Sequence, residues 1–301
     1  MGSISGNVNT RPDSKEIRVL VTGFGVGYPD ITPRFTPQSW SCSINVELPE
    51  ASKNLSADCG FHQPFRAQFP INPSWEIASR LPPYVPTNVK DEGHHPHARP
   101  PINKTTPRIK IETYGAPVHV GYKAVRELVP VLLDDTKPDY ILHIGMASGR
   151  SFYSCERRGH RDGYFMKDVD GKVLNDEHNK IQEGDDWVWH DCPGELLTSL
   201  PFDKMFRQWK EACPEVDTRI SEDAGNYLCD FIYYTSLAHR HKHQQPNKTM
   251  FLHVPVDADP ESVLKGVEIT TELIRAMVEC DLKTQANVGD NINTAEEKVD
   301  L

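Results

Sequence analysis

The stretch PDYILHIGMA at residues 138–147 decides the fold that we expect. It is a short, mostly apolar run that begins after a proline boundary and leads into a glycine-containing loop at 148–150. Such a run is typical of a central strand that is buried on both faces of a sheet. Similar runs occur before and after it along the chain, at 17–24, 108–114, 216–221 and 249–256.

Segments with helical periodicity alternate with these strands from residue 108 onward. The helices that we expect lie at 71–81, 120–135, 202–212, 225–240 and 261–279. The first of them starts with Asn72, a favourable N-cap, and Pro73, a favourable first helical residue. The alternation predicts an α/β fold, a three-layer α/β/α sandwich with a largely parallel (mixed) central sheet.

The domain organisation follows from where this pattern stops. Residues 1–16 are polar and predict a disordered arm, and residues 283–301 predict a disordered tail. Between them, 17–282 form a single domain, because no linker or internal repeat divides the ordered parts. Two irregular insertions, at about 25–70 and 83–107, are rich in proline and lack periodicity.

Composition excludes several classes of protein. The formal net charge of −10 does not fit the basic surface of a nucleic-acid-binding protein. The first 16 residues lack the apolar core of a secretory signal, and no apolar run approaches membrane-spanning length. The seven cysteines are scattered without a C-x-x-C pair, as expected for free thiols in a reducing compartment. We therefore expect a cytoplasmic protein with no cofactor, no metal, no membrane contact and no nucleic-acid partner.

Cys229 is the first candidate for chemistry, in the sequence SEDAGNYLCDFIYY. Ser221 or Asp223 can cap the helix that follows, and Gly225 allows a tight turn. Cys229 then lies about one turn into the helix, where the positive end of the helix dipole favours a thiolate. For a cysteine seen without context, the commoner interpretation is a small apolar residue on a buried face.

His253 and Glu156 are the other two candidates. His253 stands near the end of an otherwise apolar strand, and the carboxyl ends of strands in open α/β sheets are where functional sites gather. Glu156 follows a glycine-rich turn and can orient an imidazole. The commoner alternatives are a core histidine bonded to a backbone carbonyl and a surface glutamate paired with an arginine.

The joint arrangement of these motifs resembles the pyroglutamyl-peptidase I family. The shared pieces are G-x-A-x-G-R at 145–150 followed by Glu156-Arg157, D-A-G-x-Y-x-C at 223–229, and F-x-H-x-P at 251–255. The segments VLVTGF (19–24) and INPSW (71–75) are also similar to that family. The resemblance covers the ordered parts of 17–280 in the family's order.

The resemblance implies a cysteine peptidase that removes N-terminal pyroglutamate from small peptides through a thioester intermediate. It implies that Cys229 is the nucleophile, His253 the general base and later acid, and Glu156 the acidic residue that orients the histidine. It also implies that backbone N–H groups near the helix start stabilise the oxyanion. No metal is required by this chemistry.

The pocket for the lactam ring is also implied by the resemblance. In the family, aromatic residues after the first strand cover the ring, which carries over to Phe24. The turn here reads GFGVGYP at 23–29, with Gly27 where the family has a second phenylalanine, so we expect Tyr28 to substitute for it.

Three further positions complete the expected substrate site. Residues just before the nucleophile line the pocket in the family, which carries over to Tyr227 and Leu228. Met146 stands where the family has a glutamine, and we expect its side chain to give the lactam an apolar contact in place of a hydrogen bond.

Other interpretations remain open at this point. GFGVGY (23–28) suggests a dinucleotide site, but it lacks the third glycine of that motif and is followed by a proline-rich segment. Metal sites are conceivable at two histidine clusters, although solvated side chains are the commoner outcome: His94, His95 and His97, or His239, His241 and His243. A homologue that binds peptide N-termini or another small ligand without turnover is the alternative to an active peptidase.

Overall fold

The computed structural model describes residues 16–25, 71–86 and 107–296, with side chains through 287. A six-stranded sheet in the order β2-β1-β3-β8-β4-β7 forms its centre. Its strands are β1 (Ile17–Gly23), β2 (Ile109–Thr113), β3 (Tyr140–Met146), β4 (Tyr153–Glu156), β7 (Thr218–Ser221) and β8 (Thr249–Val254). Neighbouring strands are parallel except for β4 and β8, which are antiparallel. The largely parallel, mixed sheet that the sequence predicted is confirmed.

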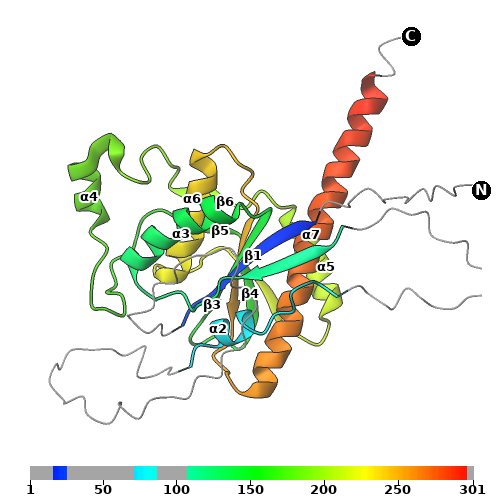
Figure 1. Ribbon diagram of the computed structural model, residues 1–301, viewed down its shortest axis with the longest axis horizontal. Helices are drawn as coiled ribbons and strands as arrows, with labels where there is room; N and C mark the ends of the chain where they lie inside the picture. Colours follow the sequence, from blue (N-terminus) through cyan, green and yellow to red (C-terminus); the bar gives the residue numbers. More distant parts are fainter. Residues whose placement is uncertain (1–15, 26–70, 87–106, 297–301) are drawn as a thin grey trace, which may run out of the picture.

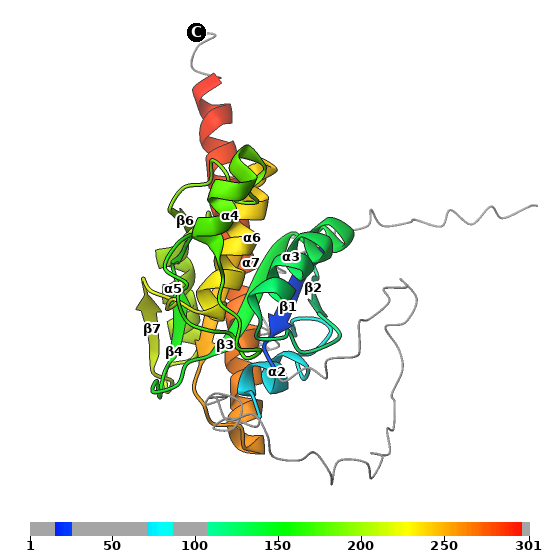
Figure 2. The same ribbon diagram turned by 90° about the vertical axis from the view of Figure 1, so that its left-hand side faces the viewer.

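Helices cover both faces of this sheet, which completes the expected three layers (Figures 1 and 2). The helices are α2 (Pro73–Ala78), α3 (Tyr122–Thr136), α5 (Phe202–Ala212), α6 (Leu228–Lys242) and α7 (Pro260–Glu296). On one face α2, α5 and α7 bury a core that includes Trp209 and Leu273. On the other face α3 and α6 bury a second core that includes Val125 and Phe231. We call these the α7 face and the α6 face.

Strand alternation assigns each side chain of β3 to one of these faces. Leu142 and Ile144 lie in the core of the α7 face, whereas Ile141 lies in the core of the α6 face. Successive side chains of a strand point to opposite sides of the sheet, so His143 and Gly145 also face α6. His143 is buried there between the hydroxyls of Thr22 and Ser236, each 2.7 Å from a ring nitrogen.

Helix α2 forms for the reasons that the sequence predicted. Asn72 is the N-cap of α2, its side-chain oxygen accepts a hydrogen bond from the Ser74 N–H at 3.1 Å, and Pro73 is the first helical residue. The helix ends at Ala78, three residues before the expected end at 81. Among the described residues, no helix is long and apolar enough to cross a membrane.

The structure differs from the sequence-based expectation in two places. Helix α7 continues to Glu296, whereas the sequence predicted a disordered tail from 283. The stretch between β3 and α5 also holds elements that we did not predict: β4, a small antiparallel pair of β5 (Arg158–His160) and β6 (Glu195–Leu197), and α4 (Asp176–Glu183). The expected arm and most of both insertions lie outside the described residues.

Candidate active site

Strand pairing brings Glu156 and His253 to one face of the sheet. Because β4 and β8 are antiparallel, Ser154 lies opposite His253 and Glu156 lies opposite Phe251. Residues opposite one another point to the same side of a sheet. Phe251 belongs to the core of the α6 face, so Glu156 and His253 also face α6.

The two side chains form a buried pair. His253 Nδ1 lies 2.7 Å from Glu156 Oε1, and the residues are 4% and 0% exposed. Because a carboxylate can only accept, Nδ1 carries a proton, and in the neutral imidazole Nε2 then keeps a lone pair. Glu156 Oε1 also accepts a hydrogen bond from Arg150 Nη1 at 3.0 Å, and the same nitrogen donates to Ser154 Oγ at 2.8 Å. Glu156 is therefore fixed in a position from which it orients the imidazole.

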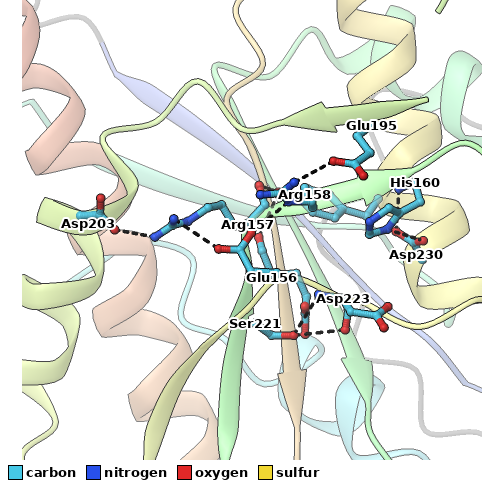
Figure 3. Close-up of polar contacts among 11 residues, drawn as sticks. Glu156, Arg157, Arg158, His160, Glu195, Asp203, Ser221, Asp223 and Asp230 are labelled. Carbon is cyan, nitrogen blue, oxygen red and sulfur yellow. Dashed lines mark hydrogen bonds and ion pairs between the residues drawn. The ribbon is translucent and has the colours of Figure 1, made fainter. Parts of the chain in front are cut away.

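The two arginines that follow Glu156 in the sequence form ion pairs with other carboxylates and not with the carboxylate of Glu156. Arg157 pairs with Asp203 and Glu222, and Arg158 pairs with Glu195 and Glu222 (Figure 3). The interpretation of Glu156 as a surface glutamate is therefore wrong, because Arg157 and Arg158 pair with other carboxylates while Glu156 is fully buried.

Cys229 approaches the sheet through a gap left by Gly145. A Cβ atom placed on Gly145 would lie 2.8 Å from the Cys229 sulfur and 2.5 Å from Cζ of Phe251. Gly145 is the residue of β3 that pairs with His253 of β8. The thiol thus lies against the strand next to His253, on the same face as Glu156. The isolated glycine in a strand of bulky residues was the sequence signal for this close approach.

The start of α6 differs from the expected one. The helix begins at Leu228 with Tyr227 as a backbone N-cap, so Cys229 is its second residue and no side chain caps it. The expected capping by Ser221 or Asp223 is wrong. Asp223 Oδ1 instead accepts from the Gly225 N–H at 2.8 Å, and the Ser221 hydroxyl donates to the Asp223 carbonyl (Figure 3). Both side chains serve the turn before the helix.

Asp230 holds the first turn of α6 in place. Its fully buried carboxylate accepts from the backbone N–H of His160 at 3.0 Å and lies 3.1 Å from His160 Nδ1 (Figure 3). The hydrogen bond with Asp230 raises the pKa of His160. This contact fastens the turn that carries Cys229 to β5. This contact could not be predicted from the sequence, because the two residues lie 70 positions apart in the chain.

The electrostatic surroundings of Cys229 oppose ionisation. Burial raises the pKa of the Cys229 thiol to about 12, the carboxylates of Glu156 and Asp230 act in the same direction, and Arg150 lowers it by less. The expectation of a thiolate at the helix start is therefore not supported, since burial and two carboxylates raise the pKa of Cys229. The residue itself remains partly exposed, which leaves a route for a substrate.

Three of the expected pocket residues lie on the same face as Cys229. Phe24, at the end of β1, and Leu228 are buried in the core of the α6 face, and Tyr227 packs partly buried against it. The Tyr227 ring meets Tyr122 edge-on, with centroids 6.2 Å apart. All three therefore belong to the same core against which Cys229 packs. Tyr28 lies outside the described residues.

Met146 faces the other way. It pairs with Val254, whose side chain lies in the core of the α7 face, and it alternates with Gly145 along β3. Alternation therefore places the Met146 side chain on the α7 face, opposite Cys229. The structure gives no support for the expected contact between this side chain and a substrate.

Comparisons with known proteins point to one family. The family model for pyroglutamyl peptidase matches residues 103–278. Pyrrolidone-carboxylate peptidase from Pyrococcus furiosus is 30% identical over 169 residues, which is 55% of this chain and 76% of that protein. Pyroglutamyl-peptidase 1 from Homo sapiens is 29% identical over 147 residues, which is 49% of this chain and 63% of that protein.

Solved structures show the same fold. A crystal structure of pyrrolidone carboxyl peptidase from P. furiosus superposes with a TM-score of 0.53 at 21% sequence identity, covering 89% of this chain and 99% of that one. The family match includes Glu156, Cys229 and His253, and it spans more than half of the sequence. This chain belongs to the pyroglutamyl peptidase family.

Proposed function

We propose that the protein is a cysteine peptidase that hydrolyses the bond after an N-terminal pyroglutamate of small peptides, with Cys229, His253 and Glu156 as its triad. The observation that carries the proposal is the buried 2.7 Å contact between Glu156 and His253 beside the gap at Gly145 that admits the Cys229 sulfur. The alternative of a homologue that only binds peptide ends is not favoured, because Cys229, His253 and Glu156 all lie on the same face of the sheet.

The reaction begins from a protonated thiol. Since the pKa of Cys229 is raised to about 12, His253 Nε2 takes the thiol proton as the sulfur attacks the pyroglutamyl carbonyl carbon. Glu156 stabilises the imidazolium that forms. The negative charge moves to the carbonyl oxygen, where N–H groups of the first turn of α6 can donate to it, because a helix leaves its first N–H groups without intrahelical acceptors.

Two steps complete the turnover. The C–N bond breaks, His253 returns the proton to the departing amine, and a thioester joins the pyroglutamyl group to Cys229. Water then attacks the thioester with His253 as base, which releases pyroglutamate and restores the thiol. Phe24, Tyr227 and Leu228 offer the flat lactam apolar walls, and a neutral ring without a free amine suits such a pocket. Location in the cytoplasm stays a prediction.

An assay with a fluorogenic pyroglutamyl amide tests this function. We expect release of the fluorophore from the pyroglutamyl amide, and loss of that release after alkylation with iodoacetamide at pH 9, where more of the thiol is ionised. The prolyl amide, which lacks the ring carbonyl, serves as the matched substrate and should be cleaved at least tenfold more slowly. Undiminished hydrolysis after complete labelling of Cys229, or no hydrolysis of the pyroglutamyl amide, would contradict the proposal.

Gly145→Ala is expected to lower kcat on the pyroglutamyl amide by roughly 10- to 100-fold, because small displacements of a reacting group have effects of this size. The added Cβ would lie under 3.0 Å from the Cys229 sulfur and the Phe251 ring, so the thiol must move. Steady-state kinetics measure the change. Gly115→Ala is the control, because no atom lies within 4 Å of its added Cβ. A kcat equal to that of the unmodified protein would refute this placement of the thiol.

A further inference from the structure

A second group of reactive side chains lies at the opposite end of α6 from Cys229. It consists of His239 in the last turn of α6, His243 directly after the helix, and Asp134 near the end of α3. One ligand atom from each lies within 4.8 Å of the other two. Among residues whose side chains the structure describes, this is the single grouping of three or more histidine, cysteine and carboxylate groups close enough to share a metal ion.

The two histidines are arranged as a pair of nitrogen ligands. They are four residues apart, so they lie on the same side of the helix, and their ring centroids are 4.2 Å apart. His243 Nδ1 donates to the His239 backbone carbonyl at 2.8 Å, which fixes the proton on Nδ1 and leaves the Nε2 lone pair available. This use of one ring nitrogen to orient the other is the usual support of a metal-bound histidine.

Asp134 supplies a carboxylate from the neighbouring helix. Its Oδ1 lies 3.1 Å from His239 Nε2, close to the spacing of about 3.3 Å that two ligands take around a tetrahedral zinc ion. The His239 side chain is 9% exposed and therefore held in place, whereas Asp134 is 61% exposed and can adjust. A hollow of about 330 Å³ borders both residues and has room for a water ligand.

The nearby cations donate to other groups, although the charge of Arg240 still disfavours a second positive charge at His239, whose pKa is lowered by burial first and by this charge to a smaller extent. Arg240 donates to the carbonyls of Pro138 and Pro246, and Lys242 donates to the carbonyl of Val188. Lys248, which lines the same hollow, pairs with Asp281 at 2.8 Å.

We propose that His239, His243 and Asp134 form a binding site for a divalent transition-metal ion that joins the ends of α3 and α6. Two imidazoles and a carboxylate suit Zn²⁺, Co²⁺ and Ni²⁺. The ion replaces the hydrogen bond between His239 and Asp134, with the His239 proton moving to Nδ1. The site lies roughly 15 Å along α6 from Cys229, so it is separate from the catalytic group. His241, which the sequence grouped with these histidines, points to another side of the helix.

Nickel titration of the untagged full-length protein tests the site. Ni²⁺ is chosen because cysteine thiolates favour Zn²⁺, which would therefore also bind to the free cysteines. Equilibrium dialysis gives the affinity, and thermal unfolding with and without Ni²⁺ gives the shift in Tm. We expect a rise in Tm on the order of 5 °C at a hundredfold excess over Kd. His243→Ala should raise Kd at least tenfold and remove most of the Tm shift, and Asp134→Asn should weaken binding several-fold.

His241→Ala is the matched control, because it removes an exposed histidine from the same helix without touching the proposed ligands. Its Kd should stay within twofold of that of the unmodified protein. Any Ni²⁺ bound by the HHPH tract at 94–97 is a background common to all variants, so Kd is taken from a two-site fit in which that background is held constant. The proposal is overturned if the protein binds no Ni²⁺, if His243→Ala binds it unchanged, or if His241→Ala weakens binding as much as His243→Ala does.

Discussion

Cys229→Ala is expected to lower kcat on a pyroglutamyl amide by at least about 10⁴-fold, because alanine offers no nucleophile and the remaining groups cannot form the thioester. The helix start should stay folded, since Asp230 and His160 hold that turn independently of the thiol. Turnover under saturating substrate measures the effect, and thermal unfolding verifies the fold.

Cys213→Ala is the matched control for this variant. Cys213 is a buried free thiol at the end of α5, in the core of the α7 face, and it takes no part in the proposed site. We expect its kcat to stay within about twofold of the unmodified protein. Turnover by Cys229→Ala at the unmodified rate would eliminate Cys229 as the nucleophile.

Glu156→Gln is expected to lower kcat by roughly 10³- to 10⁴-fold, by analogy with the loss of the orienting carboxylate in a serine protease triad. The amide of glutamine would donate to His253 Nδ1, which moves the ring proton to Nε2 and prevents it from accepting the thiol proton. Stopped or continuous amide-hydrolysis assays measure this loss.

The same variant has a second readout that a structural defect would not produce. The Glu156 carboxylate raises the pKa of Cys229, so its removal should lower that pKa and speed alkylation by iodoacetamide while hydrolysis slows. Glu222→Gln is the control, because Glu222 is a half-exposed carboxylate that pairs with Arg157 and Arg158. Hydrolysis within tenfold of the unmodified rate in Glu156→Gln would exclude Glu156 from the triad.

The sequence was sufficient for most of the architecture. From residue 108 onward, strands and helices with clear periodicity alternate, and α5 occupies the predicted residues 202–212. The segment that holds β4 was not recognised as a strand, because SFYSCERRGH has no apolar run and its register depends on a partner 97 residues away. Buried polar residues at a functional site conceal the usual pattern of a strand.

The chemistry of the site was only partly accessible from the sequence. Local helix position suggested an acidic Cys229 thiol, but its ionisation depends on burial against Gly145 and on carboxylates from other elements. The face of Met146 also follows from strand register, which the sequence does not specify. Residue types are visible in the sequence, whereas their solvation and orientation arise from tertiary packing.

The antiparallel pairing of β4 with β8 has a consequence for how the protein can diverge. Backbone hydrogen bonds between these two strands set the separation of Glu156 and His253. The segment of chain that connects the two strands contains α4, α5, β7 and α6. Loop insertions and deletions in that excursion therefore leave the spacing of Glu156 and His253 intact, provided that the strands keep their register and α6 keeps its place. Only the loops between these elements can acquire new lengths and surfaces in this way, because α6 carries Cys229 and its first turn is tied to β5 by Asp230 and His160.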